Sequence, residues 1–337
     1  MKIGGHDLRD RVLVVAEIGN NHEGDVDVAA ELVDRAAEAG VDAVKFQTFR
    51  TAHYVSRSDG ERYRRLEQFE LGASDFRRLA ERARSRGLLF ISTPFDLESV
   101  KVLEPLVDAF KIASGDNCFY PLLESVARSP RPMIISSGLS DLDDIKHTWA
   151  FVASRRPDGA ARQDVAILHC VSAYPVEPEQ ANLRTIQTLA AELGCDVGYS
   201  DHTRGIDAAV LAVGLGARII EKHFTLSRTY STFRDHDLSA DPDEMRELVR
   251  RVRLAAVLLG DGEKKIQPVE ADGVESLRRS IVAAEDLPAG HVLRADDLTW
   301  VRPGGGLPPG DEHRLLGRAL AHDVRFGERL QPSDVRG

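Results

Sequence analysis

The sequence predicts an α/β protein in which a (β/α)₈ TIM barrel is followed by a small, mostly β second domain. Three observations carry this prediction. Apolar runs of strand length alternate with helix-like segments through the first 260 residues. The loops between them are short, and strands that alternate with helices form parallel sheets. After residue 276 the pattern changes to a tandem repeat with many turn residues.

The strand-like runs number eight and lie at 12–18, 43–46, 88–92, 109–113, 132–136, 165–170, 196–199 and 218–222. Each is followed by apolar residues at helical spacing, as at Ala29, Leu32 and Val33. Eight such units in about 250 residues match a closed barrel. An open doubly wound sheet is the structural alternative, but no strand-linked Gly-x-Gly-x-x-Gly supports a dinucleotide fold. The last barrel helix is predicted over 242–259, with Asp241 as its cap.

The carboxyl-terminal part divides into a linker and a repeat. Residues 261–276 are polar and punctuated by glycine, so they predict a linker between a barrel domain, 1–260, and a second domain, 277–337. Segments 284–298 and 321–335 align without gaps, with the matches Ala284/Ala321, Asp286/Asp323, Gly290/Gly327, Leu293/Leu330 and Asp297/Asp334. This repeat predicts a pseudo-symmetric module of turns and short strands. About sixty residues give only a marginal core, so the module is expected to lean on the barrel or on another subunit.

Composition narrows the classes of partner. The net charge is −10 and no basic block occurs, which argues against nucleic acid or an anionic membrane as a partner. No apolar run approaches the ~18 residues that span a bilayer, and the first ten residues lack the apolar core of a signal peptide. The three cysteines, Cys118, Cys170 and Cys195, are sparse and odd in number, which is typical of a reducing cytosol. We therefore expect a cytoplasmic protein.

The predicted strands end in polar side chains, and barrel active sites lie at those ends. The candidates are Glu17, Lys45, Gln47, Thr93, Lys111, Ser114, Ser136, Ser137, His169, Tyr174, Ser200, Asp201, His202 and His223. Lys45 and Lys111 stand out because a buried ammonium group is costly unless it is paired. Glu17 can pair with one of them as a structural ion pair. The favoured interpretation is that the lysines and hydroxyl groups bind a phosphate or a carboxylate.

His202 and His223 are predicted at equivalent ends of two neighbouring strands. Neutral imidazole is the commonest protein ligand of metals, and a histidine pair suits a divalent transition metal. The alternative is a pair of hydrogen-bonded barrel histidines without a metal, because spacing alone produces such matches. Arg302 lies in a loop of glycine and proline residues. It is either solvated or a side chain that reaches into another site.

Together these residues resemble the bacterial sialic acid synthase family along nearly the whole chain. The resemblance is carried by Ala16-Glu17-Ile18-Gly19, Val44-Lys45-Phe46-Gln47-Thr48, Ser92-Thr93-Pro94-Phe95, Lys111-Ile112-Ala113-Ser114-Gly115, Ile135-Ser136-Ser137-Gly138, His169-Cys170, Tyr174-Pro175, Ser200-Asp201-His202-Thr203, Glu221-Lys222-His223-Phe224-Thr225 and Arg302-Pro303-Gly304. It implies a barrel with a carboxyl-terminal SAF, or antifreeze-like, domain. It also implies a transferase that condenses phosphoenolpyruvate with an N-acylated hexose, such as N-acetylmannosamine or a 6-deoxy di-N-acetyl sugar, and releases phosphate.

The resemblance also implies roles for single residues. The catalytic set is Glu17, Lys45, Lys111 and Asp116, and the phosphoenolpyruvate set is Lys45, Thr93, Lys111, Ser114, Ser136 and Ser200. The sugar-binding set is Asp116, Ser172, Tyr174, Asp235 and Arg302. His202 and His223 would hold a divalent metal, Mn²⁺ above Mg²⁺ or Co²⁺. Arg302 would come from the partner subunit of a domain-swapped homodimer.

The sequence departs from the family pattern at four places, which we expect on the sugar side of the site. They are Asp116, the run Asn117-Cys118-Phe119, Ser172, and the segment 228–235 with Phe233 and Arg234. The reaction type is therefore better predicted than the acceptor. One alternative is a related phosphoenolpyruvate-condensing synthase for another aldose, phosphorylated or unusual, in surface-glycan or natural-product assembly. A non-enzymatic alternative is a sugar-binding scaffold.

Overall fold

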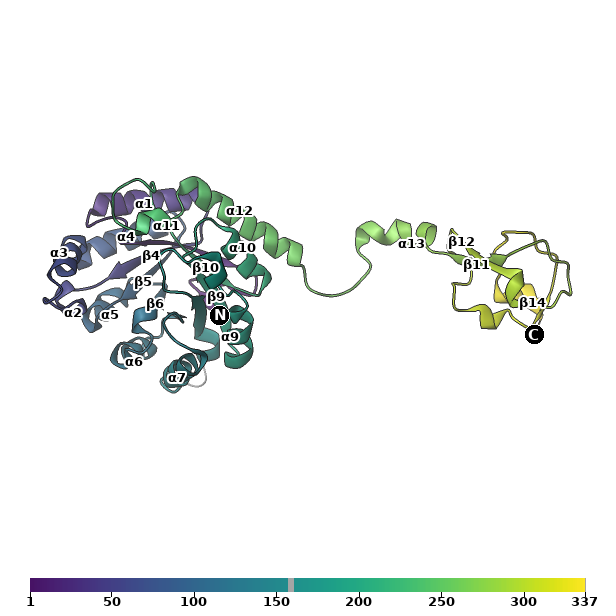
Figure 1. Cartoon of the computed structure of the whole chain (residues 1–337), viewed down its shortest axis with the longest axis horizontal. Helices are drawn as coiled ribbons and strands as arrows, with labels where there is room; N and C mark the ends of the chain where they lie inside the picture. Colours follow the sequence, from purple (N-terminus) through teal and green to yellow (C-terminus); the bar gives the residue numbers. More distant parts are fainter. Residues whose placement is uncertain (157–160, 337) are drawn as a thin grey trace. The chain divides into compact units, whose positions relative to one another are not determined.

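The computed structural model describes residues 1–156 and 161–336, which form two compact units, Met1–Gly260 and Asp261–Gly337. In the described part of the first unit, eight parallel strands close into a barrel (Figure 1). They are β3 (Leu13–Gly19), β4 (Ala43–Thr48), β5 (Leu89–Pro94), β6 (Ala109–Ile112), β7 (Met133–Ser136), β8 (Val165–Cys170), β9 (Asp196–Asp201) and β10 (Ile219–His223). Strand order around the barrel follows the chain, and β10 closes it by pairing with β3. The barrel prediction is confirmed, and the open sheet is excluded.

A helix follows each barrel strand and packs on its outer side. These helices are α1 (Val26–Ala39), α4 (Ala73–Ser85), α5 (Leu97–Leu103), α6 (Tyr120–Ala127), α7 (Leu142–Ala153), α9 (Thr185–Leu193), α10 (Asp207–Gly214) and α12 (Pro242–Leu259). Shorter helices lie in the connections: α2 (Thr51–Tyr54), α3 (Gly60–Phe69), α8 (Ala161–Asp164) and α11 (Asp235–Leu238). Among the residues described, no helix is long and apolar enough to cross a membrane.

Local sequence explains where the long helices begin and end. The Asp241 carboxylate accepts hydrogen bonds from the amides of Asp243 and Glu244, and Pro242 occupies the first turn of α12, as predicted. Helix α1 begins in the same way at Asp25 and ends at Gly40, whose φ of 84° is the left-handed conformation that favours glycine.

Alternation along each strand sorts side chains between the barrel interior and the helices. On β3, Val14 and Ala16 pack outward with the helices, whereas Leu13 and Val15 point inward. The lower interior is an apolar layer made of Leu13, Val15, Ala43, Ile91, Ala109, Ile134, Ala166, Leu168 and Ile219. A hairpin of β1 (Lys2–Ile3) and β2 (His6–Asp7), with Met1, Ile3 and Leu8 in the same cluster, closes this end. Polar interior side chains are therefore confined to the carboxyl ends of the strands.

The second unit has the predicted internal symmetry. It contains β11 (Ser280–Ala283), β12 (Leu298–Val301), β13 (Ala319–Leu320) and β14 (Val335–Arg336), which pair as β11–β12 and β13–β14. Asp286 accepts from the amide of Phe326 at 2.7 Å, and its repeat equivalent Asp323 accepts from the amide of Ala289 at 2.7 Å. Leu293 and its equivalent Leu330 are both buried in the small core. The two copies therefore exchange matching hydrogen bonds, which confirms the pseudo-symmetric module.

The segment predicted as a linker is partly folded. Residues Ala271–Leu277 form helix α13, and the backbone oxygen of Glu275 accepts from the amide of Gly304 at 2.6 Å within the second unit. The sequence prediction missed this helix because seven residues carry too little periodicity to distinguish a helix from a polar loop.

Candidate active site

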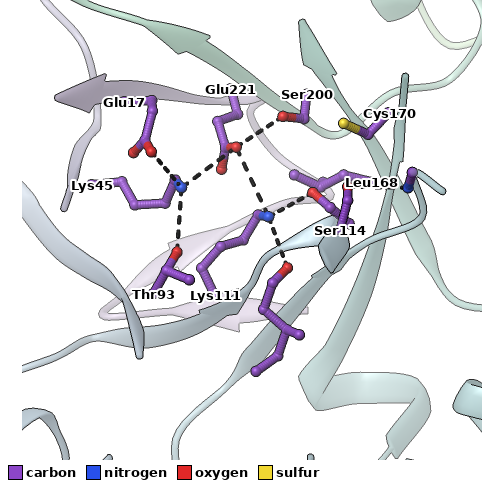
Figure 2. A network of polar contacts seen from close by, with 12 residues as sticks. Glu17, Lys45, Thr93, Lys111, Ser114, Leu168, Cys170, Ser200 and Glu221 are labelled. Carbon is purple, nitrogen blue, oxygen red and sulfur yellow. Dashed lines mark hydrogen bonds and ion pairs between the residues drawn. The ribbon is translucent and has the colours of Figure 1, made fainter. Parts of the chain in front are cut away.

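The inward positions at the carboxyl ends of the strands form a buried layer of opposite charges (Figure 2). Lys45 Nζ lies 3.0 Å from Glu17 Oε1 and 3.6 Å from Glu221 Oε1. Lys111 Nζ lies 3.9 Å from the same Glu221 oxygen. All four side chains are at most 7% exposed. The two predicted lysines therefore meet at the centre of the barrel and are joined by Glu221.

Hydroxyl groups surround the two ammonium groups. Lys45 donates to Thr93 Oγ1 at 3.4 Å, and Lys111 donates to Ser136 Oγ at 2.6 Å. Ser200 donates to Glu221 Oε1 at 2.9 Å, which turns its hydroxyl toward the same centre (Figure 2). Ammonium groups and hydroxyl donors that converge in a dry site form a pocket for a multiply charged anion.

The pKa values of the two lysines are shifted in opposite directions, because their charged neighbours differ. Burial lowers the pKa of Lys45, but the carboxylates of Glu17 and Glu221 outweigh it and raise that pKa above its usual value. For Lys111, burial prevails over the more distant Glu221 and lowers the pKa. Lys111 thus lacks part of the negative charge that its ammonium group needs. A bound phosphate would supply that charge.

The buried carboxylate of Glu17 likewise lacks part of the opposite charge that would stabilise it. Burial raises the pKa of its carboxyl group, although Lys45 acts against this change. One carboxylate oxygen, Oε1, accepts from Gln47 Nε2 at 3.1 Å, and Gln47 in turn accepts from Asn20 Nδ2 at 2.9 Å. The other oxygen, Oε2, is buried and has no hydrogen-bond partner among the described residues. A carboxylate with a raised pKa and a free oxygen is suited to take up a proton near neutral pH.

The two predicted metal ligands lie side by side above this layer. The rings of His202 and His223 have centroids 5.4 Å apart, and both side chains are buried. His202 Nδ1 lies 2.8 Å from the backbone oxygen of Val171, so Nε2 is the ring nitrogen that remains for another partner. His223 Nδ1 is buried without a partner in the described structure, and burial holds the pKa of His223 well below its usual value. A neutral, unpartnered imidazole nitrogen is what a metal ligand requires, so His223 Nδ1 fits a divalent metal, and the neighbouring His202 ring is the candidate for a second ligand.

Two protein ligands do not complete a coordination shell. No group of three or more His, Cys, Asp or Glu residues that could hold a metal occurs within the described ranges. A metal on this pair would therefore keep positions for water and substrate, as catalytic sites do. A buried ion pair fixes the strand ends that carry the pair, because Lys222 Nζ lies 3.0 Å from Asp201 Oδ2 and both are fully buried.

A cavity of about 530 Å³ opens above the charged layer. Its wall includes the predicted residues Ser114, Asp116, Ser172, Tyr174, His223 and Asp235. Burial raises the pKa of Asp116 to about 6 and also raises the pKa of Asp235. The Tyr174 ring lies 4.2 Å from the His202 ring, which links the cavity to the histidine pair. Aromatic side chains complete the wall: Tyr54, Phe69, Phe95 and Phe233.

The positions that depart from the family pattern fall in two places. Asp116, Ser172, Phe233 and Arg234 line the cavity, as expected for the sugar side. The expectation is wrong for the run after Asp116, because neither Cys118 nor Phe119 lines the active-site cavity, and both are exposed. Asn117 instead donates to the backbone oxygens of Ser136 and Gly138, at 3.2 and 3.0 Å, and supports the end of β7.

Other site residues were not singled out from the sequence. Glu221 is the main one, and its signal was available because it precedes His223 by two positions on a strand and shares its face. Asn20, Arg62 and Arg65 also line the cavity, but they come from a loop and from α3, where no strand alternation marks them. Arg302 is exposed in the second unit, and its implied role in the site stays a prediction.

Comparisons with known proteins identify the family. The sequence profile of the NeuB family matches residues 32–264, which is more than half of the chain. The chain belongs to the NeuB family. The profile of the SAF domain matches residues 278–336, in agreement with the symmetric second unit.

Individual relatives cover nearly the whole chain. An uncharacterized protein of Methanocaldococcus jannaschii is 42% identical over 325 residues, 96% of this chain and 94% of that protein. The N,N'-diacetyllegionaminic acid synthase of Legionella pneumophila is 39% identical over 332 residues, 94% of this chain and 92% of that protein. The crystal structure of the N-acetylneuraminic acid synthetase from Leptospira borgpetersenii, in complex with citrate, is 35% identical with a TM-score of 0.73, over 82% of this chain and 93% of that one. This NeuB-family chain is thus similar to nonulosonic acid synthases, enzymes of the sialic acid synthase type.

Proposed function

We propose that this NeuB-family protein condenses phosphoenolpyruvate with the open-chain form of an N-acylated hexose and releases phosphate. The observation that carries the proposal is the buried pair Lys45 and Lys111, which is flanked by hydroxyl groups and lies next to a sugar-sized cavity whose wall includes Ser114. A scaffold protein would gain nothing from two buried ammonium groups, which are costly to desolvate. The two named relatives are synthases of different acids, so the acceptor is not carried over from them.

The charged layer would bind the phosphate of phosphoenolpyruvate. Lys45 and Lys111 supply the positive charge, and the hydroxyl groups of Thr93, Ser136 and Ser200 supply donors. Ser114, which accepts from the amide of Gly138 at 3.2 Å, lies on the cavity wall and would border the same anion. This arrangement fixes the enol carbon relative to the cavity above, which is a positioning contribution to catalysis.

The reaction would then proceed in the cavity. C3 of phosphoenolpyruvate attacks the aldehyde carbon of the sugar, and the aldehyde oxygen takes up a proton. Water adds to the cationic C2 and gives a proton to a base, for which Glu17 Oε2 is free. The bond between C2 and the phosphate oxygen breaks, and a 2-keto acid and inorganic phosphate result. Asp116, Ser172, Tyr174 and Asp235 would hold the sugar.

The same proposal includes a divalent metal, Mn²⁺ above Mg²⁺ or Co²⁺, held by His202 and His223. A metal at this position would supply Lewis-acid polarisation of the aldehyde. The support from the chain itself is the buried, unpartnered Nδ1 of His223 and the proximity of the two rings. The Tyr174 ring packs against both imidazoles, at 4.2 and 5.9 Å, and would exclude bulk water from them.

One assay tests the reaction. The purified protein, with Mn²⁺ and phosphoenolpyruvate, is given N-acetylmannosamine and di-N-acetylated 6-deoxyhexoses, and inorganic phosphate is measured. We expect phosphate release that depends on one acceptor, a product whose mass equals acceptor plus pyruvate, and loss of turnover on chelation that Mn²⁺ restores. Phosphate release in the absence of any aldose would contradict the proposed function. So would the absence of phosphate release with every aldose of a broad panel. Activity that survives full chelation would remove the metal from it.

We also propose a homodimer in which Arg302 of the partner subunit reaches the sugar, as the family resemblance implies. Complementation tests this arrangement. Lys45→Met and Arg302→Ala variants are each expected to be inactive. After the two are mixed in equal amounts and exchange subunits, about a quarter of wild-type activity should return, because about half of the dimers are mixed and each mixed dimer has one of its two sites intact. If Arg302 served its own chain, every mixed site would carry a defect, and no activity would return.

A further inference from the structure

Three arginine side chains line the outer wall of the active-site cavity. Arg62 and Arg65 come from α3, and Arg234 comes from the segment between β10 and α11. Arg65 and Arg234, with Phe69 and Phe233, also line a second cavity of about 550 Å³. The two cavities therefore share a cationic and aromatic wall.

The positive charge on this wall is only partly compensated within the described residues. Arg234 Nε lies 3.2 Å from Asp235 Oδ1, and its guanidinium stacks 5.0 Å from the Tyr174 ring. Within the described residues, Arg62 contacts Tyr54, with its guanidinium carbon 5.6 Å from the ring centroid, and Arg65 makes no ion pair or hydrogen bond. The two are three positions apart on α3 and thus occupy one helix face, where like charges repel weakly.

Among the described residues, the carboxylates that line the two cavities form no ion pair with Arg62 or Arg65. Glu23 lines the second cavity, but its Oε1 lies 3.0 Å from His236 Nε2 and also accepts from Ser231. Asp116 lines the active-site cavity, and burial disfavours its charge. Some surface arginines outside this wall pair with carboxylates, as Arg78 does with Asp27 at 2.6 Å. In a protein of net charge −10, Arg62 and Arg65 remain available to an external anion.

The phosphate of phosphoenolpyruvate is not that anion. Its proposed pocket is the layer of Lys45 and Lys111, and neither lysine lines the cavity wall that carries the arginines. The acceptor sugar is the other substrate, and its aldehyde must face the enol carbon beside Glu17 and His223. The opposite end of the sugar would then extend toward α3. Planar guanidinium groups bind phosphate and carboxylate with paired, directional donors.

We propose that the acceptor carries an anionic substituent, phosphate or carboxylate, at the end furthest from its aldehyde, and that Arg62 and Arg65 bind it with Arg234 beside them. This inference rests on the proposed condensation and names the class of its second substrate. Phe69 and Phe233, whose rings pack edge to face with centroids 5.3 Å apart, would flank the carbon chain between the two ends. A neutral 6-deoxy sugar would leave the two arginines without a partner.

Acceptor competition tests the inference on the full-length protein with Mn²⁺. The acceptors are N-acetylmannosamine, N-acetylmannosamine 6-phosphate and N-acetylmannosaminuronic acid, so that the neutral, phosphate and carboxylate forms share one ring. We expect kcat/KM for one anionic form to exceed that for the neutral form by about 100-fold or more, since hydrogen bonds to charged groups contribute most to discrimination. The phosphate and carboxylate arms show which anion the wall selects.

Variants test whether Arg62 and Arg65 cause the preference for an anionic acceptor. Arg62→Ala/Arg65→Ala should raise KM for the anionic acceptor by at least about tenfold, with KM for phosphoenolpyruvate unchanged. Arg64→Ala is the matched control, because Arg64 is an exposed arginine of the same helix that does not line the cavity. Folding of each variant is checked by its thermal unfolding midpoint. The wild-type preference should weaken at high salt because the site is open to solvent.

Two results would overturn the inference while leaving the proposed function intact. One is a neutral acceptor used as well as, or better than, both anionic forms. The other is a double variant that loses the same factor in kcat/KM with neutral and anionic acceptors, or whose KM for phosphoenolpyruvate rises. A rise in that KM would show that the arginines act on phosphoenolpyruvate instead. Absence of phosphate release with all three sugars and with the wider panel would overturn the condensation itself.

Discussion

Replacing Lys45 with methionine gives the sharpest test of the buried charge layer. The change keeps the length of the side chain and removes its charge from between Glu17 and Glu221, at 3.0 and 3.6 Å. At an effective dielectric constant of about 20, the two attractions amount to about 5 kcal/mol each before desolvation is counted. Breaking a buried pair usually costs about 3–5 kcal/mol. We expect the lower end of this range, because burial already raises the pKa of Glu17 and lets it neutralise by taking up a proton.

The assay is a double-mutant cycle in urea without substrate. Lys45→Met, Glu17→Gln and the double variant are unfolded alongside wild type, and we expect a coupling free energy of about 3 kcal/mol. Lys146 and Glu192 form the control cycle. Their side chains lie 2.5 Å apart but are 41% and 44% exposed, so a coupling below about 1 kcal/mol is expected.

The same variants report on phosphate binding. Phosphoenolpyruvate at about 100 times its Kd should stabilise wild type by about 2.7 kcal/mol, and Glu17→Gln should keep most of this stabilisation. Lys45→Met should lose it. A coupling as small as that of the control pair would refute the buried-pair argument. Full stabilisation of Lys45→Met by phosphoenolpyruvate would refute the assignment of the phosphate pocket.

Three further predictions concern other parts of the barrel. Burial raises the pKa of Asp116 to about 6, so the native state binds more protons than the unfolded state between about pH 4 and 6, and its stability falls as pH rises through that window. Asp116→Asn removes this fall, and its advantage in unfolding free energy should grow by up to about 3 kcal/mol from pH 4 to pH 7 in urea titrations. A constant difference across that range would contradict the burial argument. His223→Ala should lower Mn²⁺ affinity more than about tenfold in calorimetry, whereas the exposed His147→Ala should not. Gly198→Ala would bring a methyl group to 2.5 Å from both the Ile219 backbone oxygen and Leu168, so a loss above about 2 kcal/mol in unfolding free energy is expected, and near-neutral stability would show that β9 can shift.

Local sequence signals were sufficient for most of the fold. The alternation of strand and helix patterns predicted the barrel, and the cap at Asp241 fixed the start of the last helix. The repeat in 284–298 and 321–335 predicted the pseudo-symmetric module, in which Asp286 and Asp323 make equivalent hydrogen bonds. These features are local or periodic, so they can be recognised from neighbouring or regularly spaced residues in the sequence. The helix α13 was missed because seven residues are too few to show a period.

The sequence by itself determined which side chains stand at the ends of the strands, because the position along a strand also fixes the face on which a residue lies. It thereby predicted that Lys45, Lys111, His202 and His223 gather at one end of the barrel. Only the tertiary structure decided the pairing among them. Glu221 joins both lysines because closure of the barrel brings strands distant in the sequence within 4 Å. Arginines from α3 reach the same cavity for a similar reason, since a connection between strands has no period that shows where its side chains will lie.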